Sequence, residues 1–204
     1  MSAASMSHPI VGILLAAGSG RRFGSDKLSH RLPDGTPMAV AAAVRLLPVC
    51  ERVVAVLRPG RDQLAAALKA VGCDIVFCPE AEGGMGHSLA AGVSASAEAA
   101  GWIVALADMP FIASSSHAAV AAALQAGASL AATQYRGRRG HPVGFARAWQ
   151  NQLTGLTGDQ GGKTLLEQHR QLLTLCPVDD PGVVRDIDYP RDLIDAGSGT
   201  SPHE

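Results

Sequence analysis

The sequence predicts an α/β fold: a single Rossmann-like, three-layer domain with a mainly parallel sheet and a less regular C-terminal portion. Short apolar runs alternate with segments of helical spacing, which is the pattern of parallel strands joined by helices. The run 102–107 is apolar without interruption, as expected of a central strand that is buried on both faces. A chain of 204 residues is long enough for one such domain and cramped for two.

The predicted elements alternate regularly as far as Tyr135. A strand at 11–16 precedes a glycine-rich loop, and the helix at 37–47 opens with proline in its first turn. The helix at 114–124 begins with serines, which we expect to cap it. The other strands of this part are expected at 52–57, 74–77, 102–107 and 129–134, and the other helices at 62–71 and 87–99.

The last third of the chain is richer in glycine and charge. Its expected elements are a hairpin at 136–140, a strand at 143–145, helices near 146–153 and 163–170, a strand at 172–177 and a terminal helix from Pro190. Residues 1–8 and 197–204 are expected to be flexible tails, so the domain should span 9–196. Ligands bind at the carboxyl edge of such sheets, so the strand-ending loops of the first half should carry the site.

Composition excludes several classes of protein. Hydrophobic residues make up 47% and charged residues 17%, which is too apolar for a disordered chain. Lys+Arg 17 against Asp+Glu 18 gives a net charge of −1, without the basic surplus of a nucleic-acid-binding domain. The apolar run 10–17 is shorter than the roughly 20 residues that span a bilayer, and no basic residue precedes it, unlike a secretion signal. We therefore expect a cytoplasmic protein with no nucleic-acid partner and no membrane association.

The four cysteines, Cys50, Cys73, Cys78 and Cys176, lack the C-x-x-C spacing of metal or redox sites. Cys73 and Cys78 flank a predicted strand and should point to opposite faces of it, so they cannot share a metal. We expect all four to be reduced, in agreement with a cytoplasmic location.

The loop 15–27, LAAGSGRRFGSDK, is the first candidate for chemistry. Its glycines let backbone amides turn toward a phosphate, and Arg22 and Lys27 supply fixed cations. It is not a dinucleotide fingerprint, because Gly24 comes one residue late and Arg58, not an acidic residue, follows the second strand. A nicotinamide-dependent oxidoreductase is therefore disfavoured. No glycine in the loop is followed by Lys and then Ser or Thr, so it is not a Walker loop either.

This loop resembles the signature of the MobA-like nucleotidyltransferases. Within that group the chain is most similar to the molybdenum cofactor cytidylyltransferases, and the resemblance covers about 10–193. The segment 140–145, GHPVGF, favours the cytidylyl branch. The other matching segments, in the same order, are GMGHSL at 84–89, LADMP at 106–110, GDQGG at 158–162 and DIDYP at 186–190.

The resemblance implies transfer of CMP from CTP to the phosphate of molybdenum-loaded molybdopterin, with release of pyrophosphate and Mg²⁺ as cofactor. It implies catalytic roles for Arg22, Lys27 and Asp108, and metal binding by Asp108 and Asp188. The implied nucleotide contacts are Leu15, Ala16, Ala17, Gly18, Gly20, Arg22, Lys27 and Asp108. The loops after Leu57 and Phe77, with Glu80 and Ser88 nearby, are placed to read a base edge, so these two residues are also expected nucleotide contacts. The implied acceptor contacts are His141, Pro142 and Asp159.

The carboxylates also have structural interpretations. Asp108 could cap the helix that follows it, and Asp188 the helix from Pro190. As metal ligands they would suffice, because Mg²⁺ keeps waters and phosphates in most of its positions. Asp186 is the weaker candidate for the second ligand.

His141 could be a structural histidine, a general base or a binding residue. The expected acceptor is a phosphate monoester that is largely ionised near neutral pH, so a base is unnecessary and we assign His141 to binding. The segment 158–164, GDQGGKT, resembles a Walker loop, but it is one residue short and no strong strand precedes it. We discount ATPase activity on that basis.

The basic residues of the last third leave two readings open. Arg136, Arg138 and Arg139 form either a bank for an anionic acceptor or a solvated hairpin tip. Lys163 is either a phosphate contact or a surface charge.

Three other functions compete with cytidylyl transfer. A guanylyltransferase of the same pathway would share the mechanism, and a sugar-phosphate nucleotidyltransferase is disfavoured because the chain lacks an added sugar-side domain. A non-catalytic carrier would deliver the finished dinucleotide to a molybdoenzyme and would not need Asp108 or Lys27. The expected partners are thus CTP or another NTP, molybdopterin and a recipient molybdoenzyme.

Overall fold

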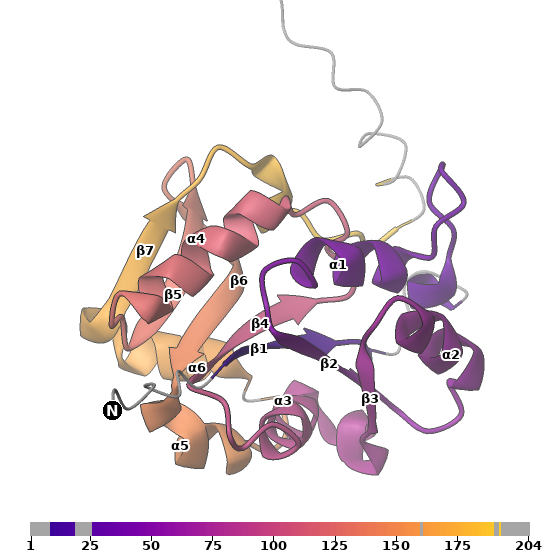
Figure 1. The fold of residues 1–204 in the computed structure, drawn as a ribbon, viewed down its shortest axis with the longest axis horizontal. Coiled ribbons are helices and arrows are strands. Elements are labelled where there is room, and N and C mark those ends of the chain that lie inside the picture. The colour runs from indigo at the N-terminus through magenta and orange to yellow at the C-terminus, as the bar shows by residue number, and fades with distance from the viewer. Residues whose placement is uncertain (1–8, 19–25, 160, 190–191, 193–204) are drawn as a thin grey trace, which may run out of the picture.

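A computed structural model describes residues 9–18, 26–159, 161–189 and 192. Its strands form one seven-stranded sheet in the order β3-β2-β1-β4-β6-β5-β7 (Figure 1). The strands are β1 (Ile10–Leu15), β2 (Arg52–Leu57), β3 (Asp74–Phe77), β4 (Gly101–Leu106), β5 (Leu130–Tyr135), β6 (Arg138–Ala146) and β7 (Leu173–Pro177). Strands β1 to β4 pair in parallel, β6 is antiparallel to both β4 and β5, and β7 is parallel to β5. The predicted mainly parallel α/β sheet is confirmed.

Helices cover both faces of the sheet and complete the three layers. One face carries α1 (Met38–Leu46), α2 (Asp62–Ala70) and α4 (Ser114–Gln125), and the other carries α3 (Met85–Ser94), α5 (Gln150–Thr154) and α6 (Gly162–Gln168). Figure 1 shows α1 and α4 above the sheet and α3 and α5 below it. The short 3-10 turns are η2 (Lys27–Ser29), η3 (Pro79–Gly83), η4 (Arg147–Trp149), η5 (Arg170–Leu172) and η6 (Pro181–Val184).

The core lies on both sides of β4, as its unbroken apolar sequence predicts. Ile103 packs with the α1 and α4 side, whereas Trp102 packs with the α3 and α5 side, and both are fully buried. Cys73 and Cys78 likewise belong to opposite cores, so the prediction that they face away from each other is confirmed.

Helix α3 lies unusually close to the sheet because it presents a glycine to it. A Cβ atom added to Gly92 would come within 2.7 Å of the Ile13 side chain of β1. This close packing holds α3 against β1. The first turn of α3 then faces the carboxyl edge of the sheet.

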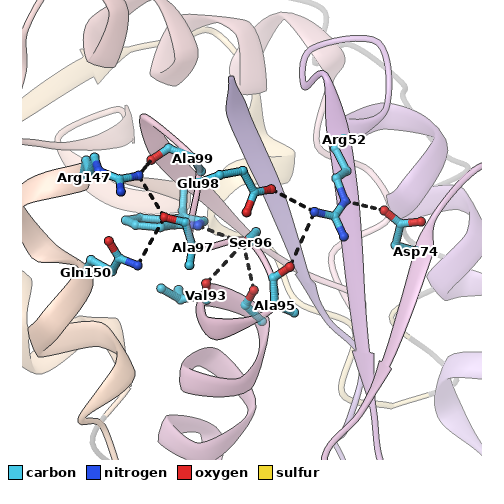
Figure 2. A network of polar contacts seen from close by, with 12 residues as sticks. Arg52, Asp74, Val93, Ala95, Ser96, Ala97, Glu98, Ala99, Arg147 and Gln150 are labelled. Carbon is cyan, nitrogen blue, oxygen red and sulfur yellow. Dashed lines mark hydrogen bonds and ion pairs between the residues drawn. The ribbon is translucent and has the colours of Figure 1, made fainter. Parts of the chain in front are cut away.

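Two arginines hold the opposite end of α3, at the amino edge of the sheet (Figure 2). Arg52 forms ion pairs with Asp74 and Glu98. Arg147 donates hydrogen bonds to the carbonyl oxygens of Ala97 at 2.8 Å and Ala99 at 2.7 Å. The turn between α3 and β4 is therefore tied to β2, β3 and η4.

The boundaries of two helices differ from the prediction. Helix α3 ends at Ser94, not at 99, because the chain turns there and the Ser96 hydroxyl donates to the Gly92 carbonyl oxygen at 2.9 Å. The expected serine cap of α4 is wrong, since Ala113 precedes the helix and the Ser116 hydroxyl donates to Asp180 instead.

The C-terminal third follows the prediction in outline. The predicted hairpin joins β5 to β6 through Arg136 and Gly137, at φ 47° and 79°. Strand β6 is longer than expected and starts at Arg138. The predicted helix from Pro190 falls outside the described residues. In the described part of the chain, no helix combines the length and apolar character needed to cross a membrane.

Candidate active site

The parallel strands β1 to β4 end at one edge of the sheet, and the loops that follow them enclose a cavity of about 470 Å³, here called the edge cavity. Six residues predicted from the sequence line it, namely Leu15, Ala17, Gly18, Ser88, Asp108 and Asp159. The register of the sheet explains why these residues lie together, because Leu15 at the end of β1 is paired with both Val56 of β2 and Leu106 of β4. The loops that follow three neighbouring strands therefore begin at the same level.

A second cavity of about 370 Å³, here called the His141 cavity, adjoins the first. The two cavities share four lining residues, Leu15, Met85, Leu106 and Asp159. Strands β4 and β6 and helices α3 and α6 supply the apolar lining of the His141 cavity, Leu89, Val104, Val143 and Leu166. Its polar lining includes Arg139, His141 and Lys163.

Lys27 joins two carboxylates from distant parts of the chain. Its Nζ donates to Asp108 Oδ2 at 2.9 Å and to Asp188 Oδ1 at 3.2 Å. Only 7% of the Lys27 side chain is exposed, against 31% for Asp108 and 39% for Asp188. Burial alone lowers the pKa of Lys27, but the hydrogen bonds and charges of the two aspartates outweigh it and raise the pKa. Lys27 therefore stays cationic at physiological pH.

Asp26 fixes the backbone from which Lys27 extends. Its carboxylate accepts a hydrogen bond from the Ser29 hydroxyl at 2.7 Å and forms an ion pair with Arg61 at the start of α2. Burial raises the pKa of Asp26, yet these two partners bring it below its ordinary value. The turn η2 is thus tied to α2, and Lys27 points away from that anchor toward the end of β4.

Asp188 reaches the site through a backbone contact with the Asp108 loop. The Ile187 amide donates to the Asp108 carbonyl oxygen at 3.0 Å, and the Ile187 side chain is fully buried against Met38 and Leu32. An extended chain alternates its side chains, so burying Ile187 turns Asp188 toward Lys27. The Asp188 and Tyr189 amides donate to the Asp192 carboxylate. The helix that Asp188 was predicted to cap starts at Pro190, which falls outside the described residues.

The Asp108 and Asp188 pair fits a divalent cation of the Mg²⁺ type. Both carboxylates approach one and the same cationic atom, and hard oxygen donors are the ligands that Mg²⁺ takes. Among the described residues, no group of three or more His, Cys, Asp or Glu side chains could hold a metal. The contacts with Lys27 bring two carboxylates together here, and Mg²⁺ takes few protein oxygens and keeps waters and phosphates as its other ligands.

His141 carries a buried polar atom with nothing to bind in the described part of the chain. Its Nδ1 has no hydrogen-bond partner there, while its carbonyl oxygen accepts from the Thr133 hydroxyl at 2.8 Å. Burial lowers the pKa of His141, against the opposing effects of the Val104 backbone and the Asp108 charge. The imidazole is therefore neutral at physiological pH and suited to hydrogen bonding with a ligand. Pro142 is itself buried and lies outside the lining of this cavity.

The loop before α6 is locked onto the loop before α3. The Gly86 amide donates to the Gly158 carbonyl oxygen at 2.8 Å. Gly84 has φ +126°, and a Cβ atom there would lie 2.2 Å from the Gly158 carbonyl carbon. This contact brings Asp159 into the lining of both cavities. Helix α5, not a strand, precedes the loop, in keeping with the rejection of a Walker loop.

Sequence reasoning missed seven residues that line the edge cavity, namely Leu28, Arg58, Ala81, Glu82, Gly84, Met85 and Leu106. Arg58 directly follows β2, so its position at the carboxyl edge was a usable signal. Glu80, the predicted contact, is exposed and lies outside that lining, with its Oε2 3.9 Å from the Cys78 thiol. The predicted residues Gly20 and Arg22 fall outside the described residues.

The three hairpin arginines do not act as one group. Arg139 lines the His141 cavity and lies 3.8 Å from Glu167, whereas Arg136 stacks over the Tyr135 ring and Arg138 is exposed. Lys163 also lines that cavity, with its Nζ 3.9 Å from Glu167. Of the proposed arginine bank, only Arg139 lines the edge cavity or the His141 cavity.

The carboxyl edge of the parallel sheet, lined by Gly18 and Asp108 beside the buried Lys27, lies where α/β proteins bind their ligands. Residues 12–172 match the MobA-like NTP transferase domain, and the chain belongs to this family of nucleotidyltransferases. The predicted family is therefore confirmed.

Two curated relatives have names that point to different roles. The chain is 29% identical over 197 residues to "Purine catabolism protein PucB" of Bacillus subtilis (strain 168), covering 90% of this chain and 93% of that protein. It is 29% identical over 188 residues to "Nicotine blue oxidoreductase" of Paenarthrobacter nicotinovorans, covering 88% of this chain and 92% of that protein. Neither name points specifically to molybdenum cofactor cytidylyltransferases.

Among solved structures, Rv0371c of Mycobacterium tuberculosis H37Rv superimposes with a TM-score of 0.82 at 25% identity, covering 93% of this chain and 97% of that one. A further structure of Rv0371c is a complex with manganese, with a TM-score of 0.77 at 23% identity, covering 93% and 98% of the two chains. The fold is thus shared with a protein that binds a divalent metal.

Proposed function

We propose that this nucleotidyltransferase transfers CMP from CTP to the phosphate of molybdenum-loaded molybdopterin. The observation that carries the proposal is the pair of adjoining cavities that share Leu15, Met85, Leu106 and Asp159, with Asp108 lining one of them. A transfer reaction needs two substrates that meet at one point. The edge cavity is the proposed place of CTP, and the His141 cavity is the proposed place of the acceptor.

In this reaction an oxygen of the acceptor phosphate attacks the α-phosphorus of CTP in line. A new P–O bond forms, the bond to the β-phosphate bridging oxygen breaks, and pyrophosphate leaves. The backbone at Ala16, Ala17 and Gly18 would bind the phosphates, together with Gly20 and Arg22 and with the Lys27 ammonium. Such residues act by positioning the reactants and neutralising charge, and no covalent bond to the protein is required.

Asp108 and Asp188 would hold the divalent cation. When bound, it supplies positive charge to the phosphate oxygens. Asp108 follows β4, and its carbonyl oxygen accepts a hydrogen bond from the amide of Ile187, the residue before Asp188, so one backbone contact holds both aspartates in place. The chain shares its fold with a protein whose structure was solved in complex with manganese, and this similarity supports a metal-dependent reaction.

The His141 cavity has the chemistry to bind a flat heteroaromatic ring. Its walls are largely apolar side chains, and the unpartnered Nδ1 of a neutral imidazole can exchange a hydrogen bond with a ring edge. A pterin combines such a face with such an edge. His141 is assigned to binding, since a phosphate monoester with a second pKa of about 6 needs no general base.

The choice of cytosine derives from the resemblance of segment 140–145 to the cytidylyl branch. Ser88, Glu82 and Arg58 are the polar side chains that the edge cavity offers to a base or ribose. A nicotinamide-dependent reaction is disfavoured, because Arg58 stands where dinucleotide-binding proteins carry an acidic residue for the ribose. The similarity to PucB is compatible with a recipient enzyme in purine catabolism.

The test is pyrophosphate release with Mg²⁺ and molybdenum-loaded molybdopterin, comparing CTP, GTP, ATP and UTP. We expect turnover with CTP, none without the acceptor, and none in Asp108→Asn protein. Lys69→Met protein, changed on the outer helix α2, serves as the active control. Preference for GTP would keep the reaction class and reassign the base. Absence of release with every nucleotide, in folded protein, would favour a carrier of the finished dinucleotide.

A further inference from the structure

Lys27 lies where a metal held by Asp108 and Asp188 would also have to lie. The Nζ atom is 2.9 Å from one carboxylate oxygen and 3.2 Å from the other. An ammonium group within hydrogen-bond distance of both leaves no room for a second cation between them. Lys27 and a divalent metal therefore compete for the same pair of oxygens.

The surroundings of Lys27 show that this pairing is not a chance surface contact. The Lys27 side chain is nearly fully buried, and its neighbour Leu28 is buried in the core while also lining the edge cavity. Exposed lysine pairs contribute little and adopt many conformations, whereas a buried ammonium needs a counter-charge to remain charged. The two aspartates supply that counter-charge.

Nucleotide phosphates would change the balance of this competition. Ala17, Gly18, Leu28 and Asp108 all line the edge cavity, and Lys27 directly precedes Leu28 and contacts Asp108, so a triphosphate bound in this cavity would bring negative charge close to Lys27. An ammonium that turns to the phosphates releases the two carboxylates. The nucleotide adds about four negative charges beside the carboxylate pair. This added charge attracts a divalent cation more strongly than a singly charged ammonium.

We propose that Lys27 and the divalent cation are mutually exclusive partners of the Asp108–Asp188 pair, and that nucleotide binding moves Lys27 from the carboxylates to the phosphates. This inference rests on the proposed metal-binding role of the two aspartates. Lys27 then performs two tasks with one charge: it neutralises the carboxylates before the nucleotide arrives and the phosphates afterwards. The consequence is an order of binding in which metal affinity is low until nucleotide is present.

The inference is tested by Mn²⁺ binding, measured by electron paramagnetic resonance on the full chain without nucleotide. Lys27→Met removes the competing charge, so we expect it to bind Mn²⁺ at least about tenfold more tightly than the unmodified protein. Lys27→Arg keeps the charge and should remain as weak as the unmodified protein. Lys69→Met is the matched control, since it removes one of the three lysines far from the site and should leave the Mn²⁺ affinity unchanged.

A second variant pair locates the bound ion. Adding Asp108→Asn to Lys27→Met should abolish the gain, because one of the two ligands is lost. The Lys27→Met protein should fold, since the two aspartates that lose the contact with Lys27 are partly exposed to water. Circular dichroism checks this, and Lys27→Gln replaces it if the apolar side chain disturbs the fold.

The inference is overturned if Lys27→Met and the unmodified protein bind Mn²⁺ with equal affinity, or if the gain survives Asp108→Asn. Adding CTP should raise the affinity of the unmodified protein for Mn²⁺. Free CTP also binds Mn²⁺, so Asp108→Asn protein at the same CTP concentration serves as the reference. The proposed function is tested separately, by the pyrophosphate assay. A negative result in that assay would not change the interpretation of the Mn²⁺ measurements.

Discussion

The amide of Gly86 donates a hydrogen bond to the carbonyl oxygen of Gly158, and this contact joins the two loops that border both cavities. Gly86 lies in the first turn of α3, and Gly158 lies in the loop that leads to α6. The first turn of α3 carries Met85 and Ser88, and the loop before α6 carries Asp159. This backbone interaction is therefore one of the contacts that set the geometry of the proposed donor and acceptor sites.

Gly84→Ala should separate these loops. The added Cβ would lie 2.2 Å from the Gly158 carbonyl carbon, and the φ of +126° is unfavourable for any side chain. We expect a loss of about 2–4 kcal/mol in the free energy of unfolding and a higher KM for both substrates. Urea denaturation and steady-state kinetics measure the two effects.

Gly127→Ala is the matched control for backbone strain alone. Gly127 also has a positive φ, +95°, but a Cβ atom there would meet nothing within 4 Å. We expect it to cost only about 1–2 kcal/mol and to leave both KM values unchanged. Equal kinetic effects of the two substitutions would contradict the role assigned to the contact between the loops.

Asp108→Asn should abolish most activity without unfolding the protein. The substitution keeps the shape of the side chain but removes a charge from Lys27 and a proposed ligand from the metal, so we expect kcat to fall by about 100-fold or more. Asp74→Asn, at the opposite edge of the sheet and paired with Arg52, should retain normal kcat. Retention of half the turnover in the Asp108→Asn protein would remove Asp108 from the catalytic group.

Much of this arrangement could be predicted from local patterns. The strands at 52–57 and 74–77 have the predicted bounds in the structure, because each is a short run rich in apolar residues between turn residues. The parallel sheet then brings the ends of β1 and β4 together, and this accounts for Gly18 and Asp108 lining one cavity.

Other parts of the site depend on contacts that local patterns do not encode. Glu82 lines the edge cavity in place of Glu80 because the turn η3 sets which side chain faces inward. Asp188 meets Lys27 only because Ile187 is buried and bonded to the Asp108 backbone. Both outcomes arise from tertiary packing between segments far apart in the sequence.

His117, which is buried, and His141, which is partly buried, predict how stability depends on pH. Burial lowers the pKa of His141 and of His117 below the ordinary value of 6.5. Above pH 6.5 both folded and unfolded forms are neutral, so stability is unaffected. Below pH 6.5 the histidines bind protons in the unfolded state but not yet in the folded state. The free energy of unfolding therefore falls until the pH reaches the pKa of the folded state.

The expected slope is up to about 1.4 kcal/mol per pH unit for each histidine. Urea denaturation between pH 5 and pH 7.5 measures it, and His117→Gln and His141→Gln should each reduce the slope below pH 6.5. His87→Gln, on the first turn of α3 and partly exposed, is the control that should leave the slope unchanged. A slope that survives both substitutions would assign the acid sensitivity to other groups.

Arg147→Met should lower stability through the turn that follows α3. The guanidinium donates to the carbonyl oxygens of Ala97 and Ala99, and its loss leaves two carbonyl groups without this partner. We expect a loss of about 1–3 kcal/mol in the free energy of unfolding, with Arg138→Met, on the exposed hairpin, within about 0.5 kcal/mol of the unmodified protein. Because the turn lies at the amino edge of the sheet, kcat should change little at temperatures where the protein is folded. A large fall in kcat with unchanged stability would instead mean that the amino edge controls the position of α3 at the site.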